Sequence, residues 1–256
     1  MFSRWRRSRI TRRPFSEAWL HILETRVEAY ARLNGDERAL LRARVQVFLA
    51  EKTFVGCAGL DVTDEMRVVV AAQASRLELG RRPTFFPHCL TVYLYPGAFV
   101  STVTDTLAGG VVDERRVVRV GESWRRGGVV LAWDETLAAS LGHTPGRNVV
   151  LHEFAHQLDG WDGSVDGVPE LRGQGALDRW QRGMQAAYLT LIHDLPRGQA
   201  SIDAYAATSP AEFFAVTTEL YFEDVDALRD RYPVVPELLE GYYGVEALGG
   251  RVRHLN

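Results

Sequence analysis

The sequence predicts an α+β fold that is mostly helical and contains a small mixed sheet, and three observations support this prediction. Apolar residues recur with helical spacing in the first third of the chain and again in its last part. Between these parts, short runs rich in valine, tyrosine and threonine are bounded by glycine and proline, which is typical of strands. Helices that precede and follow a sheet, instead of alternating with its strands, favour the α+β class.

The composition is that of an ordinary globular protein. The chain has 256 residues, of which 46% are hydrophobic and 25% are charged, enough to bury a substantial core. We expect a single domain over residues 15–256. The preceding residues 1–14 are strongly basic, and blocks of like charge usually form solvated tails. We therefore expect a flexible head, with arginines at Arg4, Arg6, Arg7, Arg9, Arg12 and Arg13.

Several functional classes are disfavoured. No stretch approaches the roughly 20 apolar residues that span a bilayer, and no secretory or twin-arginine signal follows the basic head. Cys57 and Cys89 have no CxxC partner, so we expect free thiols and a cytoplasmic location. The net charge of −3 predicts no direct binding of nucleic acid and no membrane association. Nucleic-acid binding through the head alone is the weakest alternative.

The first three helices are expected before the sheet. Residues 15–33 have helical apolar spacing and end at Asn34-Gly35. Asp36 opens a second helix over residues 36–49. A third, over residues 63–79, has Thr63 as its N-cap and Gly80 at its C-terminal stop.

Three strands are expected in the middle of the chain, followed by further helices. Residues 90–95 form a strand that Pro96-Gly97 ends. Residues 117–124 and 129–133 are separated by Arg-Arg-Gly-Gly, which predicts a hairpin. The later helices are expected at residues 146–158, 176–192, 210–222 and 236–241.

The motif His-Glu-x-x-His carries the chemistry. His152 and His156 lie one helical turn apart on one face, so both imidazoles can bind one ion. Glu153 lies beside the open position of the metal, where it can take a proton from water and deliver it to the leaving amine. The alternative is a helix whose histidines only cap or pair with acids. The apolar side formed by Leu151 and Phe154, and the strands just before, favour the metal site.

A catalytic zinc site needs a third protein ligand, and Glu212 is the better candidate. Asp159 lies one turn beyond His156 but is poorly aimed. Ser209-Pro210-Ala211-Glu212 also reads as a capping box, in which Glu212 would bond the backbone of Ser209. Glu219 lies on the same helix face and could be the ligand instead. Spacing alone leaves these alternatives open.

Tyr205 is the candidate donor to the oxyanion that forms when water attacks a peptide carbonyl. It stands seven residues before Glu212, but an aromatic residue that only packs between helices explains its position equally well. The remaining histidines lack ligand spacing, and we expect surface or core roles for His88, His143, His193 and His254.

Several segments in order resemble the Mlc titration factor A family. The resemblance runs from about residue 18 to residue 243, nearly the whole chain. It rests on several motifs, which are far more specific together than one short pattern. These are Asn-Val-Val-Leu-His-Glu-Phe-Ala-His-Gln-Leu-Asp at residues 148–159, Ala-Glu-Phe-Phe-Ala at 211–215 with Tyr205 upstream, Gly-Glu-Ser-Trp at 121–124, Val-Val-Leu-Ala-Trp at 129–133 and Val-Tyr-Leu-Tyr-Pro at 92–96.

The resemblance implies a bacterial cytoplasmic zinc peptidase of gluzincin type with a zincin-like fold, distantly similar to the anthrax lethal factor catalytic domain. It implies that His152, His156 and Glu212 bind Zn²⁺, that Glu153 is the base, and that Tyr205 is the transition-state donor. It also implies binding of Mlc, a glucose-responsive transcriptional repressor. Residues 241–245 follow the ending of the family only loosely, and the arginine-rich head matches none of its patterns.

The sequence therefore predicts a zinc metallopeptidase that acts on a peptide or protein substrate. The alternative is a non-catalytic or weakly catalytic regulator that sequesters a transcription factor. The intact Glu153 favours catalysis, because a structural metal site needs no base. An extended substrate can be held by adding to a sheet edge. We expect residues 117–124 or 129–133, and preferably 129–133, to present such an unpaired edge beside the metal.

Overall fold

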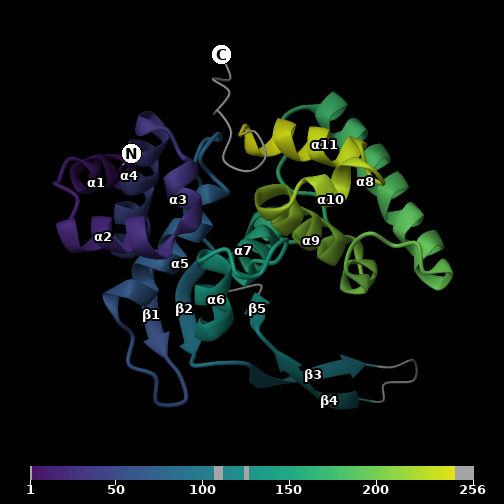
Figure 1. Cartoon of the computed structure of the whole chain (residues 1–256), viewed down its shortest axis with the longest axis horizontal. Coiled ribbons are helices and arrows are strands. Elements are labelled where there is room, and N and C mark those ends of the chain that lie inside the picture. Colours follow the sequence, from purple (N-terminus) through teal and green to yellow (C-terminus); the bar gives the residue numbers. More distant parts are fainter. Residues whose placement is uncertain (1, 107–111, 124–126, 246–256) are drawn as a thin grey trace.

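The computed structural model describes residues 2–106, 112–123 and 127–245, and within them the chain is mostly helical with a small mixed sheet (Figure 1). The strands are β1 (Thr53–Gly56), β2 (Cys89–Tyr95), β3 (Phe99–Thr106), β4 (Val112–Arg119), β5 (Gly121–Ser123) and β6 (Gly127–Ala132). The α-helices are α1 (Phe2–Thr11), α2 (Glu17–Arg26), α3 (Glu28–Arg32), α4 (Gly35–Glu51), α5 (Asp64–Arg76), α6 (Trp133–Ser140), α7 (Val149–Asp159), α8 (Gln174–Asp194), α9 (Pro210–Glu223), α10 (Asp226–Arg229) and α11 (Val234–Tyr243). Short 3₁₀ turns are η1 (Gly160–Asp162), η2 (Leu195–Arg197) and η3 (Ala204–Ala207).

The predicted helices are present, with shifted ends. The first one breaks at Val27 into α2 and α3, because the backbone of Val27 is not helical there. Asn34, rather than Asp36, caps α4 and forms a capping box with Glu37. Thr63 caps α5 as predicted. Helix α6 is an additional helix, and it takes Trp133 from the end of the predicted strand 129–133.

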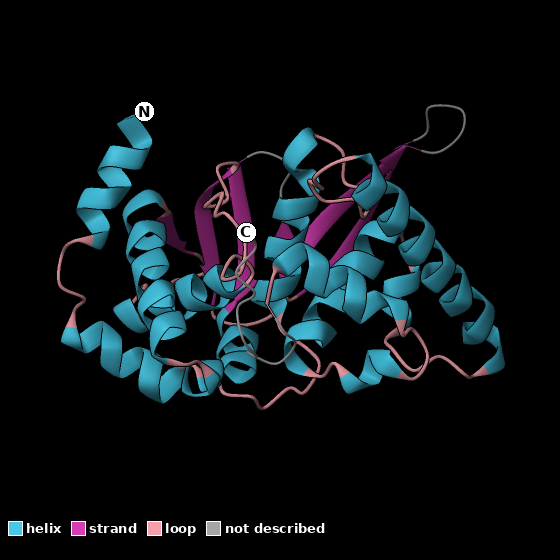
Figure 2. Cartoon of the chain, turned by 90° about the horizontal axis from the view of Figure 1, so that it is seen from above, coloured by secondary structure: helices cyan, strands magenta, loops and turns pink. Residues whose placement is uncertain are grey.

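The main sheet has four strands in the order β1-β2-β6-β5. β1, β2 and β6 run parallel to one another, whereas β5 is antiparallel to β6. The pairing of β5 with β6 agrees with the predicted hairpin, although its turn and Trp124 lie outside the described residues. β3 and β4 form a separate antiparallel pair that extends away from the four-stranded sheet (Figures 1 and 2).

The prediction that residues 129–133 present an unpaired sheet edge is wrong. β6 is paired with β2 on one side and with β5 on the other, so it is a central strand without a free edge. Its residues from Gly128 to Ala132 are buried, as in a strand covered on both faces. β5 is the strand at the end of the sheet, and it comes from the other predicted segment, 117–124. The first part of that segment belongs to β4.

The basic head contains a helix that contacts the rest of the chain. Residues 2–11 form α1, with no proline before Pro14 to break the helix. Arg6 and Arg7 both form ion pairs with Glu51 on α4, at 3.0 and 2.8 Å. The guanidinium of Arg7 also lies 4.3 Å from the ring centre of Phe85. These contacts offset the entropy of ordering the segment. The division of the chain at residue 14 and the flexibility of the head stay predictions.

Helix α7 is held in the middle of the molecule by an aromatic cluster. Phe154 on α7 lies 4.7 Å, ring centre to ring centre, from Phe86 and 5.6 Å from Phe48 on α4. All three rings are almost completely buried. Helix α5 also packs against α7, and the face of α7 that carries the histidines is turned toward α9 and β5. No helix within the described ranges combines the length and apolar character that a membrane crossing requires.

Candidate metal centre

The first two candidate ligands lie on α7, whose N-terminus is firmly capped. The side chain of Asn148 accepts a hydrogen bond from the backbone N–H of Leu151 at 3.2 Å. Leu151 and Phe154 are fully buried, which fixes the rotation of the helix about its axis. His152 and His156 therefore face the same side, where their ring centres lie 4.9 Å apart.

The third candidate ligand comes from the first turn of α9. Ser209 caps this helix and accepts a hydrogen bond from the backbone N–H of Glu212 at 3.2 Å, with Pro210 at the first helical position. The carboxylate of Glu212 does not turn back to the Ser209 backbone. It points across to α7, where its Oε2 lies 3.0 Å from His152 Nε2. Ser209 is thus a cap, while the Glu212 side chain belongs to the histidine cluster.

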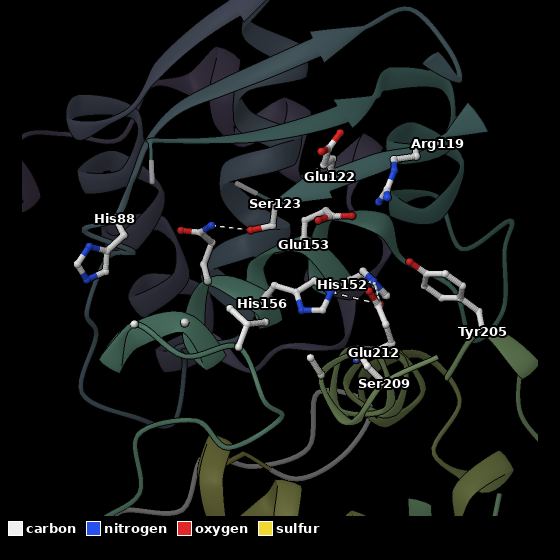
Figure 3. Close-up of a pocket in the computed structure, with 15 residues that line it drawn as sticks. His88, Arg119, Glu122, Ser123, His152, Glu153, His156, Tyr205, Ser209 and Glu212 are labelled. Carbon is white, nitrogen blue, oxygen red and sulfur yellow. Dashed lines mark hydrogen bonds and ion pairs between the residues drawn. The ribbon is translucent and has the colours of Figure 1, made fainter. Parts of the chain in front are cut away.

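Three donor atoms converge on one point (Figure 3). His156 Nε2 lies 3.3 Å from His152 Nε2 and 3.3 Å from Glu212 Oε2. Zinc bound tetrahedrally at about 2.0–2.1 Å places its neighbouring ligand atoms about 3.3–3.4 Å apart. Two imidazoles and one carboxylate at this spacing fit the donor set of a catalytic zinc ion.

Glu219 lies behind this cluster and does not take part in it. Its Oε1 lies 2.7 Å from His152 Nδ1, the ring nitrogen opposite the convergence point, and its Oε2 accepts from the backbone N–H of Asn148 at 2.6 Å. A carboxylate in this position orients a ligating imidazole and makes it a better donor. The geometry therefore distinguishes Glu219 from Glu212, which spacing alone could not do.

The carboxylates give the cluster a strong preference for positive charge. Burial disfavours a charged imidazole, but Glu219 and Glu212 outweigh it, so the pKa of His152 lies well above its usual range. Burial likewise opposes the charged form of Glu212, yet the two histidines hold the pKa of its carboxyl well below its usual range. Either protons on the histidines or a bound metal cation would balance the negative charge of these carboxylates.

Glu153 follows the first histidine and lies beside the cluster, outside the set of three. Its side chain is buried, and burial raises the pKa of its carboxyl to about 7. A group with that pKa can both accept and release a proton near neutral pH. The carboxylate lies against Gly121 of β5, because a Cβ atom there would come within 2.4 Å of Glu153 Oε1. The edge strand and the candidate base are therefore in direct contact.

Tyr205 lies on η3, just before α9, and its ring centre is 6.0 Å from that of His152. Its side chain remains 46% exposed, so it is not a simple packing residue. Burial of the hydroxyl and the neighbouring Glu212 carboxylate raise the pKa of Tyr205 to about 12. The phenol thus stays protonated at neutral pH and can donate a hydrogen bond.

These groups line one cavity of about 410 Å³, a size that suits part of a peptide. The structure adds residues that sequence reasoning missed. His88, expected to have a surface or core role, lies on the far wall, with its ring centre 5.6 Å from that of Trp161. Arg119, at the end of β4, lies near Tyr205 (Figure 3). The uninformative spacing of both residues explains why they were missed.

Asp159, at the C-terminal end of α7, is not aimed at the cluster. Both of its carboxylate oxygens accept from the backbone N–H of Gly167, at 3.0 and 2.9 Å. It therefore fixes the loop after α7, part of which lines the cavity. Asp159 is therefore not the third protein ligand, a position that Glu212 can fill.

Comparisons with known proteins identify the family of this chain. The family model described as glucose-regulated metallo-peptidase M90 matches residues 2–244. The chain belongs to the M90 metallopeptidase family. It is 41% identical over 249 residues to the uncharacterized protein slr2042 of Synechocystis, covering 95% of this chain and 90% of that protein.

Other relatives carry the name that the sequence motifs indicate. Mlc titration factor A of Klebsiella pneumoniae is 33% identical and covers 88% of this chain and 85% of its own length. Mlc titration factor A of Salmonella agona is 31% identical, with coverages of 90% and 86%. The resemblance to the Mlc titration factor A family is thereby confirmed, and M90 membership implies that the chain binds a metal.

Proposed function

We propose that this M90 protein is a zinc-dependent metallopeptidase of gluzincin type, with a zincin-like fold. The observation that carries the proposal is the spacing of His152, His156 and Glu212 donor atoms, 3.0–3.3 Å apart, with a buried carboxylate beside them. His152, His156 and Glu212 would hold the zinc ion, and Glu153 remains free to move protons. A purely structural zinc site has four protein ligands and needs no such carboxylate.

The residues divide the chemistry between them. When bound, zinc supplies a Lewis acid that polarises the carbonyl and makes water a stronger nucleophile. Glu153 accepts the proton of the attacking water and then delivers it to the nitrogen of the leaving amine. The hydroxyl of Tyr205 donates a hydrogen bond to the oxygen on which negative charge develops. The raised pKa of Tyr205 keeps that proton in place.

The substrate backbone is proposed to lie along β5. This strand ends the sheet, and its first residue touches the carboxylate of Glu153. The backbone N–H of Ala132 on β6 donates a hydrogen bond to the carbonyl of Val120. In an antiparallel pair, every second residue directs its backbone N–H and C=O at the partner strand. Accordingly, Glu122 points its backbone groups at β6, whereas Gly121 and Ser123 point theirs to the free edge. These outward groups can pair with an extended peptide without recognising its side chains.

A second role rests on the relatives alone. Proteins named Mlc titration factor A are 31–33% identical to this chain over most of its length. We propose that this chain also binds a transcriptional repressor of the Mlc type, in the cytoplasm, where the free thiols Cys57 and Cys89 would stay reduced. Binding without catalysis is the alternative function. Repressor binding by the Glu153→Gln protein, measured by calorimetry, would separate the two roles.

The decisive experiment combines metal analysis with peptide hydrolysis. Wild type should bind about one zinc ion per chain. His152→Ala and His156→Ala should lose it. Glu153→Gln should keep both zinc and fold but lose hydrolysis by about a hundredfold or more, because only proton transfer is removed. Glu135→Gln, which changes an exposed glutamate on α6, is the matched control and should behave as wild type.

The ligand assignment is tested in the same series. Glu212→Gln should weaken zinc binding much more than Glu219→Gln, for which a loss of about 10–100-fold is expected. A Glu219→Gln protein that lacks zinc beside a Glu212→Gln protein that retains it would reverse the assignment. Undiminished hydrolysis by Glu153→Gln would refute the peptidase mechanism.

A further inference from the structure

Arg119 is the only arginine or lysine among the described residues that line the cavity, whose wall also carries the carboxylates of Glu122, Glu153 and Glu212. The Nε of Arg119 is buried and has no hydrogen-bond partner among the described residues. Figure 3 draws no ion pair between Arg119 and the other residues of the wall. A partly buried guanidinium without such a partner is costly, which indicates that its partner is a bound anion.

Arg119 lies at one end of the cavity. It is the last residue of β4 and stands two positions before Gly121, a separation of about 7 Å in extended chain. Its positive charge acts on the hydroxyl of Tyr205, where it opposes the rise in the pKa of the phenol. Figure 3 shows Arg119 and Tyr205 on one side of the cavity and His88 on the other.

The direction of β5 tells which part of a substrate reaches Arg119. Antiparallel pairing is the more stable way to add a strand at an edge. A peptide that pairs antiparallel with β5 has its N-terminal residues near Ser123 and its C-terminal residues near Gly121. The carboxylate of Glu153 lies against Gly121, so the cleaved bond lies there. The residues that follow the cleaved bond then extend toward Arg119.

We propose that Arg119 binds a carboxylate on the leaving-group side of the substrate, within about two residues of the cleaved bond. The assignment rests on the proposed peptidase function. The carboxylate belongs either to the free C-terminus of a short leaving group or to an Asp or Glu side chain. Both offer two oxygens to the planar fork of a guanidinium, the geometry in which arginine binds carboxylates best.

The test uses pairs of peptides that differ only in this charge. One pair ends two residues beyond the cleaved bond, as the free acid or as the amide. The other pair is longer and amidated, with Glu or Gln as the second residue beyond the bond. We expect wild type to favour the charged member of at least one pair by about tenfold or more in kcat/KM. The pair that shows the preference identifies the source of the carboxylate.

The variants separate recognition from a structural role. Arg119→Gln should bring the charged-to-neutral ratio of kcat/KM close to one, and Arg119→Lys should keep part of the preference. Arg182→Gln, at an exposed position of α8, should keep the wild-type ratio. A wild-type ratio near one in both pairs overturns the proposal. So does an unchanged ratio in Arg119→Gln, even when both rates fall, since Arg119 would then act on the reacting atoms or the fold.

Binding measurements distinguish this proposal from the peptidase proposal itself. The same pairs can be titrated calorimetrically into zinc-loaded Glu153→Gln protein, with and without Arg119→Gln, where no turnover is needed. Tighter binding of the charged peptide that vanishes with Arg119→Gln supports the carboxylate site even when wild type cleaves nothing. Equal binding of both members to Glu153→Gln protein, with intact hydrolysis by wild type, overturns the carboxylate site and leaves the peptidase proposal standing.

Discussion

At the scale of single residues, the space beside Glu153 requires a glycine at position 121. A Cβ atom there would lie 2.4 Å from Glu153 Oε1 and 2.6 Å from Val149 Cγ2, both far inside van der Waals contact. The backbone of Gly121 is not in the left-handed region, so alanine is acceptable conformationally. Glycine is thus required at position 121 by the nearby Glu153 carboxylate and not by the conformation of the backbone.

Gly121→Ala should therefore displace the base without unfolding the protein. We expect kcat to fall by about tenfold or more, since displacements near 1 Å in the site can cost a hundredfold. Zinc content should be unchanged, because no ligand moves. Gly241→Ala on α11 is the control, since a Cβ atom at Gly241 meets nothing within 4 Å. A Gly121→Ala enzyme with full kcat would mean that Glu153 need not occupy its position in the structure.

At the scale of elements, the attachment of α7 to α5 and α9 positions the two histidines. The backbone N–H of Asn148 donates to Glu219, and its side-chain amide donates to Glu223 at 2.9 Å. Glu223 is also paired with Arg76 of α5 at 2.7 Å, with both side chains nearly inaccessible to solvent. The start of α7 is therefore anchored by a buried polar network.

Asn148→Ala should cost more than the loss of an ordinary helix cap. We expect the free energy of unfolding to fall by about 2–4 kcal/mol, the sum of the cap and the disturbed buried hydrogen bonds. Asn34→Ala, which removes the cap of the more exposed helix α4, should cost about 1 kcal/mol. Urea denaturation of both variants measures the difference. Equal losses would show that the network adds nothing beyond capping.

The role of β5 as a substrate-binding edge is testable by removing one outward N–H. Ser123→Pro deletes a donor that faces the free edge and not β6, so the sheet should survive while KM rises or turnover stops. Ser123→Ala controls for the hydroxyl, which accepts a hydrogen bond from Gln157 at 2.6 Å. Steady-state kinetics decide the matter. An unaltered KM in a folded Ser123→Pro protein would exclude backbone pairing at this residue.

At the scale of the whole molecule, the metal should act as a cross-link between α7 and α9. A ligand that binds only the folded state stabilises it by an amount that grows with the logarithm of the ligand concentration relative to Kd, about 2.7 kcal/mol at a concentration of 100 times Kd. The midpoint of thermal unfolding, followed by circular dichroism, should rise with zinc and fall with a chelator. Glu212→Gln should abolish most of that shift. The same shift in Glu212→Gln and wild type would place the stabilising metal elsewhere.

How much the sequence could predict differs between elements for physical reasons. The helices α2 to α5, α7 to α9 and α11 and the strands β2 and β6 follow from local patterns of apolar residues. The prediction that residues 129–133 form the free edge was wrong, although the sequence contained a pattern that argued against it. The run Val-Val-Leu-Ala in β6 is typical of a strand covered on both faces, and Gly-Glu-Ser in β5 lacks such a run. β1 and β3 were not predicted because their segments show no strong alternation of apolar and polar residues.

The site was predictable where it is local and ambiguous where it is tertiary. His152, Glu153 and His156 lie on one helix, so spacing alone brings them together. Spacing left Glu212 as either a capping residue or a ligand, whereas in the structure its backbone N–H bonds Ser209 while its side chain reaches the histidines. Arg119 reaches the cavity only because β4 leads into β5, and no local pattern encodes that.

The separation of the ligands along the chain has a consequence for synthesis in the cell. His152 and Glu212 are 60 residues apart, so a growing polypeptide exposes both histidines well before the glutamate leaves the ribosome. A nascent chain at that stage cannot assemble the three-donor site. The proposed proteolytic activity would therefore arise only when α9 docks on α7, which spares the incomplete polypeptide and its neighbours from premature cleavage.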